Sequence, residues 1–228
     1  MRFPLAPVAP RRRARSPVTL PGSGLTDESS LRDAAIDGGD LSGSHLELVD
    51  LEGCRLDRVA LREGSWRRCT ISDTTLDSCD AANLCLVDSG LQRVRIERSR
   101  LTGIDLAGCS VQNVQLLDCR LDLSSWRFAR LKRVAFEGCR LSGADLTEAQ
   151  LQDVTFTDCE LSGAQFRSVS VDAVRISRCV LDGISGVASL AGAVIDPLDL
   201  IGLTFELAAA LGITVDTGVE VAADDPNA

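Results

Sequence analysis

The sequence carries an apolar residue at every fifth position from Leu31 to Leu181. All 31 positions ending in 1 or 6 in that interval are apolar, although apolar residues make up 45% of the chain. Chance would give such a run about once in 10^10 to 10^11 sequences. A longer repeat of 20 residues, equal to four of these five-residue intervals, is superimposed, and we call it the coil repeat. It is visible in similar tetrapeptides at residues 91–94, 111–114, 131–134, 151–154 and 171–174.

A period of five excludes the two simplest secondary structures. A helix turns by about 100° per residue, so residues five apart would scatter around its surface. A straight strand sends residues five apart to opposite faces. A short extended segment followed by a corner in every unit returns each fifth side chain to one interior. Because the coil repeat contains four such units, the sequence predicts a solenoid with four sides per turn.

A second column of residues supports a narrow interior. We call the apolar residue at every fifth position the central residue of its five-residue unit. Two positions before each central residue the side chain is small in every unit except at Leu84 and Ile104. Eight of the nine cysteines occupy this column, so we interpret them as small apolar residues, since a linear row does not make the tetrahedron that zinc prefers. Cys85 lies outside the column and is the cysteine that we expect to react. The predicted interior cysteine ladder consists of Cys119, Cys139, Cys159 and Cys179.

With these two columns the sequence resembles the pentapeptide-repeat family, whose consensus is Ala-(Asp/Asn)-Leu-x-x. The resemblance covers residues 29–185 and implies an all-β solenoid, a right-handed quadrilateral β-helix in which the central and small residues point inward. Coils about 4.8 Å apart would make a rod roughly 37 Å long. Close copies of the consensus are Gly39-Asp40-Leu41-Ser42-Gly43, Ile104-Asp105-Leu106-Ala107-Gly108 and Ala144-Asp145-Leu146-Thr147-Glu148.

The ends of the chain differ from the repeat. Residues 1–28 hold five of the seven prolines and the run Arg11-Arg12-Arg13-Ala14-Arg15, and we expect a disordered tail there. The repeat domain is expected at 29–195, a helix with a short strand at 196–215, and a flexible acidic tail at 216–228. Because no apolar run has the length of a signal peptide or a membrane span, we expect a cytoplasmic protein that does not contact membranes.

The predicted C-terminal helix begins after Asp196, an N-cap residue followed by Pro197, and ends before Gly212. A short strand is expected at 213–215. The stretches 189–196 and 208–213 are similar to the end of mycobacterial-type members of the family, whose C-terminal helix dimerises the rod. Apolar residues surround the cylinder, which is more than a cap needs, so we predict a homodimer. The predicted dimerisation residues are Leu200, Ile201, Leu203, Phe205, Leu207 and Leu211.

The residues offer little for catalysis. The chain has one histidine, His45, no tyrosine, and no phosphate-binding loop or metal-ligand spacing. Carboxylates on an open surface lack the burial that tunes a general acid. We therefore predict a non-enzymatic protein without cofactor or metal. The net charge of −9 and a pI near 4.7 argue against direct binding of nucleic acid.

One column of acidic residues is the candidate site for a partner. The resemblance implies a dimeric DNA mimic that binds DNA gyrase or topoisomerase IV and gives tolerance to topoisomerase poisons, as the family's fluoroquinolone-resistance proteins do. The alternative is a solenoid scaffold for another protein partner, because arginines on the same face would pair with the acidic column and keep the rod soluble. The acidic column consists of Asp37, Asp57, Asp77, Glu97 and Glu137, which are spaced by whole multiples of the coil repeat.

Overall fold

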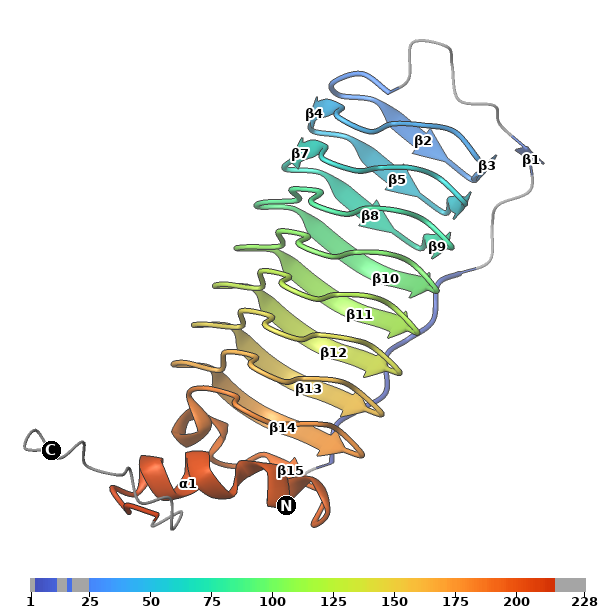
Figure 1. The fold of residues 1–228 in the computed structure, drawn as a ribbon. Helices are drawn as coiled ribbons and strands as arrows, with labels where there is room; N and C mark the ends of the chain where they lie inside the picture. The colour runs from blue at the N-terminus through green and yellow to red at the C-terminus, as the bar shows by residue number, and fades with distance from the viewer. Residues whose placement is uncertain (1–2, 12–15, 18–24, 216–228) are drawn as a thin grey trace, which may run out of the picture.

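The computed structural model describes residues 3–11, 16–17 and 25–215. They form a right-handed parallel β-solenoid of about 8 turns that ends in one short helix (Figure 1). This confirms the predicted fold class. We number the coils from residue 30, so that coil 1 is residues 30–49, coil 2 is residues 50–69, and later coils follow at the same interval. Of the helices in the described ranges, none has the length and apolarity needed to cross a membrane.

The strands become longer along the rod. Coils 1 to 3 carry separate short strands, whereas from coil 4 onward the strands of two adjacent sides merge into strands of 8 residues. The bounds are β1 Ser16–Pro17, β2 Ser30–Arg32, β3 Ala34–Asp37, β4 His45–Glu47, β5 Asp50–Glu52, β6 Arg55–Asp57, β7 Ser65–Arg67, β8 Thr70–Ser72, β9 Thr75–Asp77, β10 Gly90–Glu97, β11 Ser110–Leu117, β12 Arg130–Glu137, β13 Gln150–Thr157, β14 Ser170–Ser177 and β15 Val194–Ile195.

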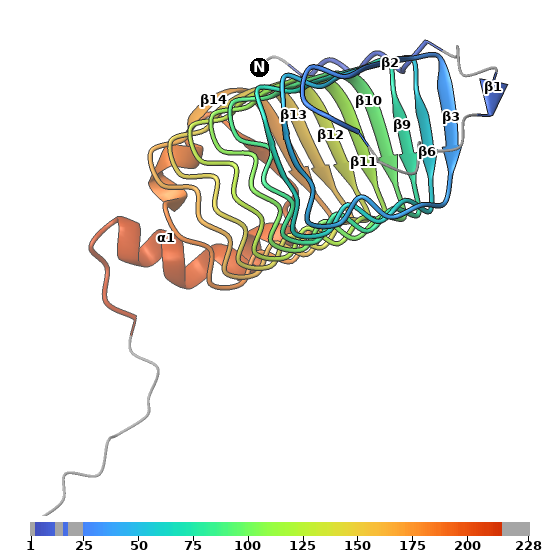
Figure 2. The same cartoon turned by 90° about the horizontal axis from the view of Figure 1, so that it is seen from above.

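Every coil pairs in parallel with the next in the register of the coil repeat, as in Val94 opposite Val114 and Val114 opposite Val134. Figure 2 shows the coils stacked one behind another along the rod. We name the sides by their central residues: face 1 runs from Leu31 to Val171, face 2 from Ile36 to Ile176, face 3 from Leu41 to Leu181, and face 4 from Leu46 to Phe166. The four faces enclose the apolar interior that the five-residue period predicts.

The corners lie two residues after each central residue. From Asp33 to Gly183, every such residue has a positive φ, between 47° at Arg98 and 74° at Gly38. Glycine, asparagine and aspartate tolerate this left-handed conformation best, which explains why these residues recur at positions ending in 3 or 8. The corner amides bond to the following coil, as Asp33 N does to Glu52 O at 2.8 Å.

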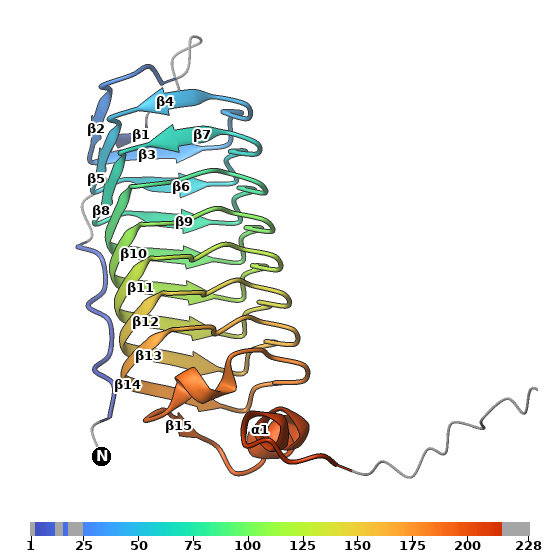
Figure 3. The same ribbon diagram turned by 90° about the vertical axis from the view of Figure 1, so that its left-hand side faces the viewer.

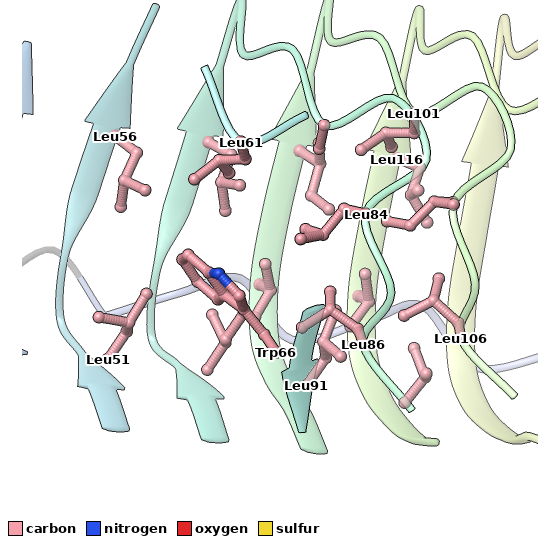
Figure 4. Close-up of a pocket in the computed structure, with 18 of the residues that line it drawn as sticks. Leu51, Leu56, Leu61, Trp66, Leu84, Leu86, Leu91, Leu101, Leu106 and Leu116 are labelled. Carbon is pink, nitrogen blue, oxygen red and sulfur yellow. The ribbon is translucent and has the colours of Figure 1, made fainter. Parts of the chain in front are cut away.

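The interior is filled unevenly. In the C-terminal half the rings of Phe136 and Phe156 stack with centroids 4.8 Å apart. In the N-terminal half Ala81 takes a central position that is larger elsewhere, and Leu84 leans across Gly64, where an added Cβ would lie 3.0 Å from Leu84 Cδ1. An apolar cavity of about 30 Å³ remains there (Figure 4). A cavity this small without polar groups stays dry and offers no ligand site.

The C-terminal segment closes the last coil. It consists of the 3-10 helices η1, Val187–Leu190, and η2, Asp199–Leu203, and the α-helix α1, Thr204–Ala210. The predicted helix over 197–211 is therefore shorter, since η2 replaces its first turns. Asp196 Oδ1 does accept the Leu198 amide at 3.1 Å, as an N-cap would.

The helix ends where the sequence predicted. The prediction of a short strand after it is wrong. Gly212 has a φ of 71°, and Ile213 N donates to Ala208 O at 2.8 Å, which makes a Schellman motif. Residues 213–215 form no strand and are exposed, because this motif turns the chain away from the sheet. The predicted acidic tail, 216–228, lies outside the described residues.

The N-terminal segment also differs from the prediction. Residues 3–11, expected to be disordered, lie extended along the rod beside the long strands (Figure 3). Residues 16–17 form β1, which pairs with β3 in coil 1. The arginines at 12, 13 and 15 lie outside the described residues.

Candidate partner-binding surfaces

The acidic column lies in register on face 2. Asp37 is paired with Asp57, and Asp57 with Asp77, while Glu97 follows in the next coil. Leu117 takes the place of an acidic residue before Glu137. The alignment agrees with the sequence analysis, and the role of these residues in binding stays a prediction.

Arginines on the same face neutralise most of this column. Arg58 pairs with Asp37, Arg98 with Asp77, and Arg95 with Glu97. Asp57 is held by Arg55 at 2.7 Å. Each of these four carboxylates therefore faces a guanidinium within its own face. Because the arginine of each ion pair is exposed to solvent, each pair stabilises the fold by only about 0 to 1 kcal/mol.

Charge varies along the rod and not just around it. Residues 25–58, which we call the acidic head, contain nine acidic and three basic residues, a net charge of −6. Residues 120–140, the basic belt, contain six basic and two acidic residues, a net charge of +4. Arg100, Arg120 and Arg140 also stack in consecutive coils on face 3. A duplex has negative charge along its whole length, so this distribution differs from that of DNA.

The acidic head has a structural explanation. In the described chain β2 pairs with β5 alone and β4 with β7 alone, which leaves strand edges at the N-terminal end of the solenoid. Charged residues on an open edge discourage pairing with another chain. Asp33, Asp40 and Glu47 are exposed at this end. Their charge therefore protects the edge whether or not a partner binds there.

The C-terminal cap has a buried side and an exposed side. Leu203 is fully buried and Leu207 packs against the core. The prediction that Leu203 contacts a second chain is wrong, because its side chain is buried against the last coil. For Leu207, which is half-buried, that contact stays a prediction. Of the other predicted dimerisation residues, Ile201 is 72% exposed and Phe205 is 59% exposed. The exposed apolar residues of this segment, which we call the cap patch, are Leu198, Leu200, Ile201, Phe205, Leu211, Ile213 and Val215.

Asp199 joins the cap to the solenoid, a role that was not predicted from the sequence. It follows Cys179 by one coil repeat, at the position that the small interior column would occupy in a further coil. Its buried Oδ2 accepts the Cys179 amide at 2.9 Å. Within the rod, Ser89 and Ser99 accept the amides of Cys69 and Cys79 in the same way, each at 3.0 Å. The sequence did contain a signal for this role, since Asp199 lies one coil repeat after Cys179, in the register of the small interior column.

The cysteine ladder lies inside the rod as predicted. Cys119, Cys139, Cys159 and Cys179 are buried and free. Hydrogen bonding to the Cys119 thiol raises the pKa of Cys139 to about 12, and burial raises the pKa of Cys109 to about 12. The Cys109 and Cys139 thiols are therefore protonated at neutral pH and behave as small apolar groups.

The remaining chemically active side chains stay apart. Cys85 is partly exposed on face 4, and His45 is exposed in β4 on the same face. Among the residues that the structure describes, no cluster of histidine, cysteine, aspartate or glutamate could hold a metal ion. The surfaces left as candidate sites are face 2, the cap patch and the corners.

Three corners carry large exposed apolar residues. Leu48, Leu123 and Phe128 have φ values of 59°, 58° and 59°, a conformation that costs bulky residues of order 1 kcal/mol or more. Leu123 and Phe128 flank face 4 within the basic belt, and the Arg127 guanidinium lies 5.4 Å from the Phe128 ring centroid. The five-residue pattern does not show which position of the unit is left-handed, so these residues could not be singled out from it.

Comparisons with known proteins agree with this architecture. A family model described as a pentapeptide repeat region matches residues 73–146 and 112–185, which lie in coils 3 to 8. No curated protein sequence matches the chain.

Three solved structures illustrate the likeness. QnrB1, a plasmid-mediated fluoroquinolone resistance protein, in a trypsin-treated form, is 22% identical over 87% of this chain and 98% of its own, with a TM-score of 0.34. HetL, involved in heterocyst differentiation regulation in the cyanobacterium Nostoc, is 18% identical over 80% and 92%, with a TM-score of 0.31. A protein of the Arabidopsis thaliana thylakoid lumen is 23% identical over 50% and 69%, with a TM-score of 0.19.

Proposed function

Because this chain is a pentapeptide-repeat protein, we propose that it acts through its surfaces, as a non-enzymatic scaffold that dimerises through the cap patch and binds another protein along the rod. The observation that supports this is the cap patch itself. Leu203 and Leu207 already pack against the core, yet seven large apolar residues of the same segment remain exposed. Apolar groups gathered in this way typically mark a protein interface.

The segment that carries the cap patch is bonded to the rod, which favours a defined dimer. Glu206 Oε1 accepts the Gly183 amide at 3.1 Å, and Asp199 accepts the Cys179 amide. These bonds fix one side of the segment on the rod and direct the other outward. A second copy that presents the same patch across a two-fold axis would bury both.

Light scattering on the full chain tests the dimer. Ile201→Glu with Phe205→Glu places charges in the cap patch and leaves Leu203 in place, so we expect the mass to fall from dimer to monomer with unchanged circular dichroism. Ser42→Glu with Gln150→Glu, both exposed on the rod outside the cap patch, adds the same charge and is the control that should stay dimeric. A wild type that is monomeric at high micromolar concentration, or a double variant that remains dimeric, would refute the proposal.

A DNA mimic directed at a type II topoisomerase is the second candidate. The regular spacing of the acidic column on face 2 favours it, because carboxylates at the coil spacing offer a row of negative charge to a DNA-binding channel. The arginines that pair with the column and the charge of the basic belt favour the scaffold instead.

A supercoiling assay with purified DNA gyrase, with and without a quinolone, separates the two. If the column acts as a mimic, the wild type inhibits supercoiling or protects against the drug, and the effect weakens as salt screens charges beyond about 8 Å at physiological ionic strength. Asp57→Asn, Asp77→Asn and Glu97→Gln together should abolish it, because they also leave the arginines that pair with these three carboxylates unneutralised. A wild type without effect excludes the mimic and leaves the scaffold.

A further inference from the structure

The N-terminal segment 3–11, which we call the strap, is bonded to one column of corners. Leu5 N donates to Asp153 Oδ1 at 3.2 Å, Val8 N to Asn113 Oδ1 at 3.3 Å, and Arg11 N to Asp73 Oδ1 at 3.1 Å. The donors are three residues apart, and successive acceptors are two coil repeats apart. Each step of three residues along the strap therefore crosses two coils.

This register is that of a polyproline II helix. Such a helix has three residues per turn and rises about 3.1 Å per residue, hence about 9.3 Å per turn. Two coils span about 9.6 Å at the usual strand spacing. Pro4, Pro7 and Pro10 recur every three residues and are half-buried against the rod, whereas the side chains of Leu5 and Val8 are exposed. Successive turns thus bring one proline and one amide to the rod.

The corner column provides an acceptor in every second coil. From coil 3 to coil 7 its residues are Asp73, Arg93, Asn113, Arg133 and Asp153, so acceptors alternate with arginines. This alternation suits an extended ligand whose donating amides are spaced along the rod by the distance of two coils. We call Asp73, Asn113 and Asp153 the strap column.

The left-handed backbone alone does not account for the strap column. Aspartate and asparagine suit any corner, and Asp118 and Asp158 occupy equivalent corners of face 2, where both are exposed. The strap column is instead buried, with Asp73 5%, Asn113 6% and Asp153 2% exposed. Buried polar groups require hydrogen-bond partners, and the strap amides supply them. Arg93 fixes the first acceptor through two bonds to Asp73, at 2.6 and 2.7 Å.

We propose that the strap column is a binding groove for proline-rich peptides in the polyproline II conformation, and that the strap is a ligand held in cis which a partner's proline-rich segment replaces. The ligand has proline at every third position, a residue with a free amide after each proline, and an arginine near Asp73, as in Pro-Leu-Ala-Pro-Val-Ala-Pro-Arg. A tethered ligand has an effective concentration of about millimolar, so it masks the groove until it is displaced.

Two double variants of the full chain separate strap register from strap conformation. Leu5→Pro with Val8→Pro keeps the polyproline II conformation but removes two amides that bind the rod. Ala6→Pro with Ala9→Pro keeps the same conformation and removes amides that have no acceptor among the described residues. The first variant should release the strap and the second should retain it, and circular dichroism should show both rods folded.

The probe is a fluorescein-labelled synthetic peptide with the sequence of residues 3–11, measured by fluorescence anisotropy. It should bind the Leu5→Pro/Val8→Pro protein at least tenfold more tightly than the wild type, and bind the Ala6→Pro/Ala9→Pro protein as weakly as the wild type. Adding Asn113→Gly and Asp153→Gly to the released protein should abolish binding. Glycine keeps the corner, as Gly53 does in the same column.

Four results would overturn the proposal. One is equal affinity of the peptide for wild type and released protein, and another is binding that survives the two glycine substitutions. The third is equal binding by a peptide of the same composition whose prolines are adjacent, because that would show general stickiness in place of a three-residue register. Absence of binding to the released protein at millimolar peptide also excludes a groove that acts on a separate ligand.

Discussion

Leu121 and Leu123 are two positions apart and occupy opposite environments. Leu121 is a central residue of face 3 and is fully buried, whereas Leu123 is a corner residue that is 69% exposed. Residue type alone therefore does not determine how much a substitution destabilises the protein. The position of the residue within the five-residue unit decides it.

These two leucines make a matched test. Leu121→Asp places an unpaired charge in a narrow apolar interior, and we expect it to lower the free energy of unfolding by about 4 kcal/mol or more, or to unfold several coils. Leu123→Asn should raise that free energy by up to about 1 kcal/mol, since asparagine tolerates the left-handed backbone. Urea denaturation followed by circular dichroism measures both. If Leu123→Asn destabilised the protein as much as Leu121→Asp, the assignment of corner and centre would be wrong.

Asp199 gives a second prediction for a single residue. Asp199→Ala removes the acceptor of the buried Cys179 amide, and leaving such a group unsatisfied costs about 1 to 3 kcal/mol. Asp199→Asn keeps an acceptor oxygen and should lose less than half as much. Hydrogen exchange at the Cys179 amide should accelerate in the alanine variant. Unchanged exchange there would show that Asp199 does not close the column.

Among the elements, the repeat was predictable and the two terminal segments were only partly so. A fixed period forces the same geometry on every unit, so the positions of Leu31 to Leu181 were enough to place the faces and the interior. The cap depends on long-range contacts such as the hydrogen bond from the Cys179 amide to Asp199, and this contact helps to hold residues 199–203 against the last coil as η2. Local helix signals at Asp196 and Gly212 carry no information about that contact.

The strap escaped prediction for a different reason. A proline-rich segment without an apolar stripe resembles a disordered tail, because it cannot bury a core of its own. Its order comes from acceptors such as Asn113, which lies in the fifth coil, far from the strap in the sequence. The relevant signals were the three-residue spacing of Pro4, Pro7 and Pro10 and the alternation of acceptors with arginines in the strap column.

The end of the strap at Arg11 should loosen in acid. Hydrogen bonds from Arg93 hold the pKa of the Asp73 carboxyl below its ordinary value of 3.8. A lowered folded pKa means that the stabilisation is fully present above the ordinary value and is lost as the pH falls through the lower one. The Arg11 amide should therefore lose its bond in strong acid, while the Val8 amide, whose acceptor Asn113 does not titrate, keeps its bond. Amide chemical shifts across a pH titration would show whether Arg11 changes before Val8.

At the scale of the whole molecule, uneven charge separates the rod into regions. The acidic head and the basic belt are separated by coils 3 and 4 and carry net charges of −6 and +4. Two rods in solution can therefore attract through these regions when salt is low, in addition to contacts between cap patches. Sedimentation of the Ile201→Glu/Phe205→Glu protein at low and high salt should show weak association that disappears as salt rises. Association independent of salt would point to an apolar contact instead.

The strap changes how the solenoid comes apart. In an array where each coil touches only its neighbours, stability is a sum of nearest-neighbour terms, and opening spreads one coil at a time. A tie from Leu5 to Arg11 connects coils 3, 5 and 7, so that none of them can separate without straining the others. Coils 3 to 7 should then exchange their amide protons as one cooperative unit, and the Leu5→Pro/Val8→Pro protein should show a graded series. A short run of prolines would thus convert a one-dimensional chain of coils into a single all-or-none transition.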